Sequence, residues 1–522
     1  MAQMTWQILA TTVTCLIVLY AFSKRTSTRY PPGPRGVPVF GNIFQLNPAN
    51  PWRTFTKWAE TYGPIVYVNA GGQPIVLLNT KKVAEDLLEN RGPKYSSRPR
   101  LVVSAEMCGN SNIAMLTGER WRKMRRTSEH ALGVRSSSNY YDIQSSESAL
   151  LAHGLLHQTT KWDSHIERAF SSMILSILYD QPVIRSLNDP SVVFMNEVVE
   201  VLSNATVPGA YLVDIFPILE HLPRCLSGWR YTAERYFQKF DSRFQQLFLT
   251  IKDKVTSGQE QRSSFCSTLA ESQKQHTMTD RECAWLSGIL YTAGHETTAT
   301  TLMWFIFAMI LHPHIQQRAQ RELDQVVGQS RLPSFADAKH LPYVQAILKE
   351  ILRWRPAIPF GVPHAIEEDD YYEGYYIPKG SICIASSWSI NRDPNVYGSN
   401  ADEFHPERHL DENGHLRDES SEGHFSYGFG QRICVGRHVA NNSLFIAMAT
   451  ILWTMTLEPG KDSRGNILKP DINAEEWNGL VIRPPHFEFN ATPRFADAES
   501  LIQQAREEIM EEVLTHPDLN DI

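Results

Sequence analysis

The chain is 522 residues long, and its composition, 42% hydrophobic and 20% charged, is that of an ordinary globular protein. A length prior alone suggests about three domains, but no Ser/Gly-rich linker or charge block divides the chain. The net charge of −7, without any long Lys/Arg tract, argues against nucleic acid as a partner.

The seven cysteines are scattered along the chain, and none is spaced as CxxC. An odd number without that spacing argues against a disulfide framework and against a structural zinc site. The globular part is therefore expected to face a reducing compartment. The glycosylation sequons at Asn204, Asn441 and Asn490 would go unused there.

Residues 1–23 are expected to anchor the chain in a membrane. Residues 5–22 are uncharged and apolar, and they are just long enough for a helix to cross a thin bilayer. Lys24, Arg25 and Arg29 follow, so the positive-inside rule places the rest of the chain in the cytosol. A cleavable signal peptide is the alternative, but its charge before the apolar run and small residues after it are missing.

A basic and proline-rich hinge is expected over residues 24–42. The stretch "YPPGPRGVPVFGN" holds four prolines, which fix φ and prevent helix formation, so it is a stiff spacer or an ordinary linker. The globular body is expected over residues 43–495. An acidic tail follows over residues 496–522, and its apolar spacing predicts a short amphipathic helix, solvated and partly frayed.

The body is predicted to be mainly α with small β-sheets. "IVYVNAGGQPIVLLN", residues 65–79, has two β-rich runs around a Gly-Gly pair and predicts a hairpin. Thr279 and Glu282 form a capping-box pattern at the start of a long apolar helix that ends before His312-Pro313. Further elements are expected as helices over residues 314–328, 341–354 and 435–457 and as strands over residues 375–377 and 382–385.

Two acid-bearing motifs lie in predicted helices. In "KEILRWRP", Glu350 and Arg353 share a face, and Arg408 of "FHPERH" could reach the same carboxylate to form a buried charge network. In "AGHETTATT", Glu296 and Thr297 lie in the middle of the long apolar helix. Thr297 either bonds back to a carbonyl one turn earlier or forms, with Glu296, a pair for proton delivery.

Two further motifs carry cations. "GERWRKMRR" places Trp121 and Arg125 on one helix face, although a solvated basic helix would have the same pattern. In "YGFGQRICVG", glycines bring backbone amides toward Cys434, and Arg432 favours a nearby anion, which favours the thiolate. A nucleophilic cysteine would need a partnered histidine in a recognisable context. A thiolate ligand of haem iron fits the loop better.

In chain order after the proline hinge, "GERWRKMRR", "AGHETTATT", "KEILRWRP", "FHPERH" and "YGFGQRICVG" resemble the cytochrome P-450 superfamily, the haem-thiolate monooxygenases, over nearly the whole chain. Stretches such as "SNATVPGAYLVDIFPILEHLP" look like the fungal microsomal branch, which is rich in enzymes of secondary metabolism. The resemblance implies haem b with Cys434 as the proximal iron ligand. It also implies that Glu296 and Thr297 are the catalytic acid–alcohol pair and that the Glu350, Arg353 and Arg408 network is structural. The residues matching the positions that hold the haem propionates are Arg98, Trp121, Arg125, His364 and Arg432.

The loop departs from the family pattern at one position. The family usually has Phe seven residues before the iron ligand, and here that residue is Tyr427, with Phe425 off register. An aromatic ring can still pack against haem, so the fold should tolerate the change. The added hydroxyl needs a partner, and it could shift the potential of the iron.

The resemblance implies a monooxygenase that uses O2 and electrons from an NADPH-dependent reductase, with its catalytic domain on the cytosolic side of the endoplasmic reticulum membrane. No flavin or nicotinamide fingerprint is evident in the chain. Four basic residues either meet the acidic reductase or are simply solvated: Arg122, Lys123, Arg126 and Arg437.

The implied substrate is a hydrophobic small molecule, a terpenoid or an aromatic polyketide. By position, Ile113, Ala293, residues 358–361 and Leu480 are expected to line its pocket. The apolar residues 207–222 either dip into the membrane or pack in the core. Two other functions stay open: an oxygen-independent haem-thiolate isomerase or dehydratase, and a non-catalytic haem- or sterol-binding membrane protein.

Overall fold

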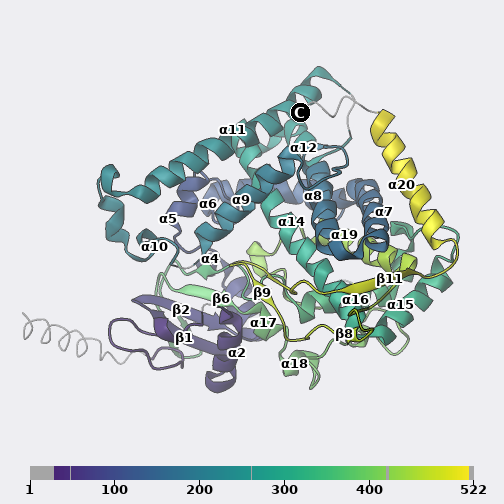
Figure 1. The fold of residues 1–522 in the computed structure, drawn as a ribbon. Coiled ribbons are helices and arrows are strands. Elements are labelled where there is room, and N and C mark those ends of the chain that lie inside the picture. The colour runs from purple at the N-terminus through teal and green to yellow at the C-terminus, as the bar shows by residue number, and fades with distance from the viewer. Residues whose placement is uncertain (1–28, 48, 208, 260–261, 419–421, 516–522) are drawn as a thin grey trace, which may run out of the picture.

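A computed structural model describes residues 29–47, 49–207, 209–259, 262–418 and 422–515. The predicted membrane anchor, residues 1–23, lies outside the described residues. In the described part, the chain is mainly helical with small sheets (Figure 1), as the sequence predicts.

Long helices make up most of the body. They are α2 (Pro51–Tyr62), α6 (Gly118–Leu132), α7 (Tyr141–His157), α8 (Trp162–Tyr179), α9 (Pro190–Thr206), α11 (Gly228–Ser257), α14 (Asp280–Leu311), α15 (Pro313–Val326), α16 (Pro342–Trp354), α19 (Arg437–Thr454) and α20 (Ala498–Thr515). The shorter α-helices are α3 (Lys81–Ala84), α4 (Gly92–Tyr95), α5 (Val102–Met107), α10 (Leu212–Ile215), α12 (Phe265–Glu271), α13 (Gln273–His276), α17 (Ser387–Ile390) and α18 (Pro394–Tyr397). Short 3₁₀ or π turns are η1 (Ile43–Gln45), η2 (Glu85–Asn90), η3 (Ser136–Tyr140), η4 (Thr159–Lys161), η5 (Pro217–His221), η6 (Arg224–Leu226), η7 (Phe335–His340), η8 (Pro406–His409) and η9 (Gly430–Arg432).

The main sheet lies beside α2 and has the strand order β1-β2-β6-β3 (Figure 1). β1 (Ile65–Ala70) and β2 (Gln73–Leu78) form the predicted antiparallel hairpin around Gly71-Gly72, and β6 (Ile382–Ala385) adds in parallel. The remaining strands are β3 (His364–Ala365), β4 (Asp370–Tyr372), β5 (Tyr375–Ile377), β7 (Met455–Lys461), β8 (Ile467–Leu468), β9 (Glu476–Trp477), β10 (Ile482–Arg483) and β11 (Phe489–Pro493).

Helix α14 crosses the centre of the body, with α8 and α11 packed against it (Figure 1). Its capping box is present, because Thr279 Oγ1 accepts from the Glu282 amide while the Glu282 carboxylate accepts from the Thr279 amide. Among the described helices, no single one has the length and hydropathy of a membrane span. Taken together, α14 and α15 have the length and hydropathy of a membrane span, but the two helices meet at a bend of 105°.

The C-terminal elements differ from the prediction in two places. α19 ends at Thr454, and the chain continues as strand β7 instead of the predicted helix to residue 457. α20 is not simply solvated, because it lies along α7 (Figure 1) and its Ile502 side chain is fully buried. An amphipathic pattern cannot distinguish a solvated helix from one whose apolar face covers a neighbour, and here α7 is that neighbour.

Candidate functional site

Cys434 lies in the short loop between η9 and α19. Its amide donates to the Tyr427 carbonyl at 2.8 Å, which folds the loop back on itself. Gly430 has a φ of +55°, and a Cβ there would lie 2.4 Å from the Leu88 carbonyl oxygen, so only glycine fits this close approach. Burial raises the pKa of the Cys434 thiol, whereas the Gly436 amide, Arg125 and Arg437 act in the opposite direction.

Beside this loop, Arg98, His364 and Arg432 converge from three segments of the chain. Burial lowers the pKa of Arg98 to about 9, that of Arg432 to about 10 and that of His364 to about 3, and nearby positive charge adds to each shift. Among the described residues, none of the three forms an ion pair with a carboxylate. At neutral pH His364 is therefore neutral, whereas the two arginines stay charged. Cations removed from solvent without a counter-charge are costly unless an anion joins them.

Backbone carbonyls fix the orientation of these side chains. Arg98 donates to the carbonyls of Ala114, Val362 and Pro363, each at 2.8 Å. His364 Nδ1 lies 2.8 Å from the Tyr95 carbonyl. The arginines are therefore held in place without being neutralised, as a site for a carboxylate-bearing ligand requires.

Helix α6 contributes the other two predicted propionate residues. Arg432 stacks on Trp121, with 4.1 Å between its guanidinium carbon and the ring centroid. Arg125 donates to the Ile433 carbonyl, next to Cys434, and pairs with Glu129 at 2.7 Å. Trp121 and Arg125 thus share the face of α6 that meets the cysteine loop.

These residues fit haem. The sulfur of Cys434 is the donor type that a haem-thiolate iron takes, and the unpaired cations match two propionates. In the described part of the chain, Arg432 Nη1 is buried without a hydrogen-bond partner, which leaves one guanidinium donor for such an anion. The six residues predicted for the cofactor come from four segments of the chain, and the fold brings them to one region.

Glu296 and Thr297 lie on α14. Thr297 Oγ1 donates to the Ala293 carbonyl at 2.8 Å, so the back-bond expected of a mid-helix threonine is present. Glu296 accepts a hydrogen bond from Asn478 Nδ2, and its other carboxylate oxygen has no hydrogen-bond partner among the described residues. Burial raises the pKa of Glu296, opposed by Asn478 and Arg483.

A cavity of about 380 Å³ adjoins Glu296 and is lined by polar and apolar side chains from α8, α9, α14 and the β9–β10 hairpin. Glu167, His295 and Arg483 are among them. The predicted substrate-lining residues Ile113, Ala293 and Leu480 are not part of its described lining. This cavity therefore lies beside Glu296 and is not the pocket predicted around those residues.

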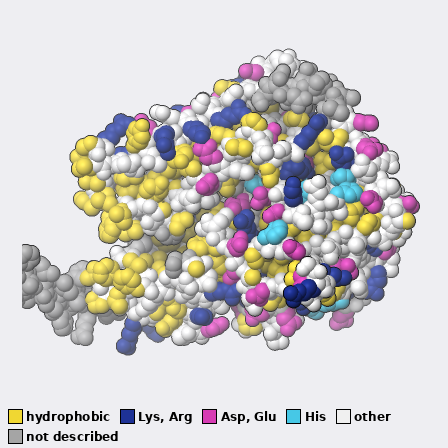
Figure 2. Space-filling model, in the orientation of Figure 1, with side chains coloured by type: hydrophobic (Ala, Val, Ile, Leu, Met, Phe, Trp, Pro, Cys, Tyr) yellow, Lys and Arg dark blue, Asp and Glu magenta, His cyan; other side chains and the backbone are white. Residues whose placement is uncertain are grey.

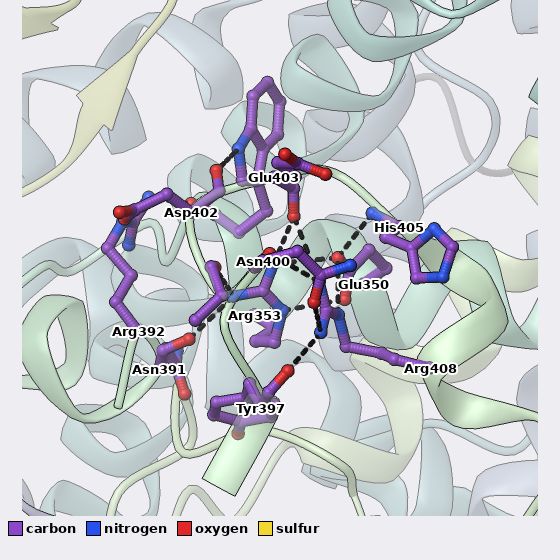
Figure 3. Close-up of polar contacts among 12 residues, drawn as sticks. Glu350, Arg353, Asn391, Arg392, Tyr397, Asn400, Asp402, Glu403, His405 and Arg408 are labelled. Carbon is purple, nitrogen blue, oxygen red and sulfur yellow. Dashed lines mark hydrogen bonds and ion pairs between the residues drawn. The ribbon is translucent and has the colours of Figure 1, made fainter. Parts of the chain in front are cut away.

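The predicted charge network is present and is centred on Glu350 (Figure 3). Arg353 binds both carboxylate oxygens at 2.7 Å, and Arg408 Nε lies 3.1 Å from Oε1. His409 Nε2 also lies 3.0 Å from Oε2. Sequence reasoning missed His409, although it directly follows Arg408 in "PERH".

Satisfied hydrogen bonds explain why this network tolerates burial. Arg353 and Glu350 are fully buried, and Arg353 also donates to the carbonyls of Asn391, Ala401 and Glu403. Burial alone would raise the pKa of Glu350, but the bonds from Arg353 and His409 outweigh it and lower the pKa to about 2. The Glu350 carboxylate is thus held ionised within the buried network.

Comparisons with known proteins agree with this geometry. The family model described as Cytochrome P450 matches residues 31–491. A cytochrome P450 monooxygenase of Armillaria gallica is 46% identical over 91% of this chain and 92% of its own length. Another from the same fungus is 43% identical over 97% and 98%. Cytochrome P450 monooxygenase 58 of Postia placenta is 41% identical over 93% of each chain.

Proposed function

The chain belongs to the cytochrome P450 family and is a haem-dependent monooxygenase, and from this premise we propose that it oxidises a hydrophobic secondary metabolite, with O2 and electrons from an NADPH-dependent reductase. One observation carries the assignment of the site: Arg98, His364 and Arg432 converge beside the Cys434 loop without a carboxylate partner among the described residues. That arrangement supports a haem bound by its propionates and by the Cys434 thiolate.

Each residue of the site then has a defined task. Cys434 would supply the thiolate ligand, whose negative charge Arg125 and Arg437 would stabilise. Arg98 and Arg432 would bind the propionates, and Trp121 fixes the plane of the Arg432 guanidinium. When bound, haem supplies the activation of O2 and the oxidation of the substrate.

Glu296 and Thr297 move protons. The Glu296 carboxyl borders the cavity of about 380 Å³, so it can take up a proton from solvent there. The Thr297 hydroxyl donates to the Ala293 carbonyl, which leaves its oxygen lone pairs free to accept a hydrogen bond from water. The pair would pass protons from the cavity toward the haem side of α14.

The substrate class follows from the residues expected around the reacting position. Ile113, Ala293, residues 358–361 and Leu480 are mostly apolar and would bury a hydrophobic skeleton. A terpenoid or an aromatic polyketide meets this requirement. Product identification after expression with a reductase and feeding of both skeleton types tests this, and turnover of polar, charged compounds alone would contradict it.

An apolar surface supports membrane association. Figure 2 shows hydrophobic side chains gathered at the left of the molecule, over the region of α10 and near the start of the described chain. Exposed apolar side chains in these two segments are Val37, Val39, Phe40, Ile43, Phe44, Leu212, Ile215, Phe216 and Ile218. With the predicted anchor over residues 1–23, this face would lie on the endoplasmic reticulum membrane and admit a lipophilic substrate.

Two of the four predicted basic residues are suited to meet an acidic reductase. Arg122 and Arg126 are exposed on α6, near the cysteine loop. Lys123 instead donates to the Thr277 carbonyl, and Arg437 pairs with Glu422 at 3.6 Å. We therefore assign the electrostatic part of reductase docking to Arg122 and Arg126.

NADPH oxidation with added reductase, measured with and without O2, tests the reaction type. Product that contains oxygen from labelled O2, formed only in aerated samples, is the expected result. Product formation without O2 would instead identify a haem-thiolate isomerase or dehydratase. Haem binding without any turnover of a broad panel of hydrophobic compounds would favour a non-catalytic binding protein.

A further inference from the structure

The hydroxyl of Tyr427, at the position where the family usually has phenylalanine, has a defined partner. Tyr427 Oη donates to Asn441 Oδ1 at 2.6 Å, and Asn441 Nδ2 donates to Glu422 Oε2 at 3.0 Å. Asn441 lies on α19, the helix that begins just after Cys434. The hydroxyl therefore connects the cysteine loop to a charged side chain.

The contacts continue from Glu422 back to the cysteine. Arg437 Nε lies 3.6 Å from Glu422 Oε1, and Arg437 Nη1 donates to the Cys434 carbonyl at 3.1 Å. The Cys434 amide in turn donates to the Tyr427 carbonyl at 2.8 Å. These five contacts form a closed ring, which we call the Tyr427 ring. It includes both the backbone amide and the backbone carbonyl of Cys434.

Helix geometry explains how the ring closes. Arg437 and Asn441 are four residues apart on α19 and so project from the same face. Glu422 comes from the segment before the glycine-rich loop, and it binds one side chain through each carboxylate oxygen. Removing the Tyr427 hydroxyl would leave Asn441 free to turn, and Glu422 would lose its fixed position.

The ring contains two opposite charges close to the thiolate. The positive charge of Arg437 favours a negative sulfur, whereas that of Glu422 opposes it. Their balance depends on how closely Glu422 is held against Arg437. Both side chains are about three-quarters buried, with 25% and 28% of their surface exposed, so solvent screens this interaction only in part.

We infer that Tyr427 is a positioning residue: through Asn441 its hydroxyl holds Glu422 against Arg437 and thereby sets the net positive charge that the Cys434 thiolate meets. The inference rests on the proposed ligation of haem by Cys434. If Glu422 moves away from Arg437, its negative charge offsets less of the positive charge of Arg437. More positive charge near the thiolate stabilises the reduced haem, so the midpoint potential of the iron rises.

Potentiometric titration of the haem-loaded protein measures this effect directly. Glu422→Gln removes the negative charge and is expected to raise the midpoint potential, by up to about 59 mV if the reduction equilibrium shifts tenfold. Arg437→Met is expected to lower it. Tyr427→Phe should shift the potential in the same direction as Glu422→Gln, by a smaller amount.

Two further variants isolate the role of the hydroxyl. In a Glu422→Gln background, Tyr427→Phe should have almost no additional effect, because the charge it positions is gone. Asn441→Leu breaks the same ring while keeping the tyrosine, and it should raise the potential as Tyr427→Phe does. Tyr343→Phe is the matched control, since it removes a tyrosine hydroxyl bonded to Glu407 at 2.8 Å, outside the Tyr427 ring.

The outcomes separate this inference from the proposed function. An unchanged potential in both Tyr427→Phe and Asn441→Leu, or an equal shift by Tyr427→Phe with and without Glu422→Gln, overturns the inference alone. If the reduced, CO-bound form of the unmodified protein lacks a thiolate-type Soret band, the proposed function is contradicted, and this inference with it.

Discussion

Arg432 lies over the indole of Trp121 at 4.1 Å, and its Nη1 is buried without a hydrogen-bond partner in the described part of the chain. The stacking fixes the guanidinium plane, so the unbonded nitrogen presents a donor of fixed direction. We assign this donor to a haem propionate, and the loss of Arg432 should therefore weaken haem binding more than it destabilises the fold.

Arg432→Met is expected to lower haem affinity about tenfold or more, because a hydrogen bond to a charged group contributes about 1.5–3 kcal/mol. Haem titration of the apoprotein, followed by absorbance, measures this change. Arg122→Met on the exposed side of α6 is the control and should bind haem like the unmodified protein. Equal affinities for all three proteins would remove Arg432 from the cofactor site.

Breaking the Glu350 network should destabilise the whole protein. Removing one partner of a buried ion pair costs about 3–5 kcal/mol, so Glu350→Gln should lower the urea midpoint strongly at neutral pH. The surface variant Glu85→Gln, in the Lys81 pair at 3.4 Å, should change stability by less than about 1 kcal/mol. A small effect of both substitutions would contradict the structural importance of the network.

The same network predicts a stability loss in acid. Bonds from Arg353 and His409 overcome burial and lower the pKa of Glu350 from 4.5 to about 2. A lowered carboxyl pKa stabilises the fold fully above about pH 4.5, and this contribution is lost as the pH falls toward 2. Denaturation midpoints measured across this window should fall less steeply for Glu350→Gln than for the unmodified protein.

Proton delivery by Glu296 should be visible as coupling between NADPH use and product. Burial raises its pKa, with Asn478 and Arg483 acting against burial, and Glu167 and His295 also border the cavity. Since the carboxyl loses its proton as the pH rises through that raised pKa, product per NADPH should fall with rising pH. Glu296→Gln should lower the ratio, raise peroxide release and flatten this pH dependence. A steep pH profile retained in Glu296→Gln would assign the proton to another group.

Two glycines of the cysteine loop offer a matched pair. At Gly430 an added Cβ would lie 2.4 Å from the Leu88 carbonyl, whereas at Gly428 it meets nothing within 4 Å, although both residues have positive φ. Gly428→Ala should therefore cost only the backbone strain of about 1–2 kcal/mol. Gly430→Ala should in addition displace the loop and reduce the haem content of purified protein. Equal haem contents would show that the close approach of Leu88 does not constrain the loop.

Local chemistry made much of this fold predictable from sequence. The capping box at Thr279, the Gly71-Gly72 turn and the break at His312-Pro313 depend on residues close together in the chain. The i, i+3 spacing of Glu350 and Arg353 likewise places both on one helix face, where they pair.

Contacts between distant segments were not predictable in the same way. The hydrogen bond from Asn478 to Glu296 joins a hairpin to α14, and α20 packs against α7, which lies more than 300 residues earlier in the chain. The partner of the Tyr427 hydroxyl could not be predicted either, because the sequence marks Asn441 only as part of a glycosylation sequon. Only the fold shows that its amide is already engaged with Glu422.

The absorption spectrum of the reduced, CO-bound protein tests the assignment of Cys434 most directly. The account predicts a thiolate-type Soret band for the unmodified protein and for the surface control Cys225→Ser, since Cys225 is exposed and outside the site. Cys434→Ser should lose that band. A thiolate-type band that persists in Cys434→Ser, or that is missing from the unmodified protein, would contradict the assignment of Cys434 as the iron ligand.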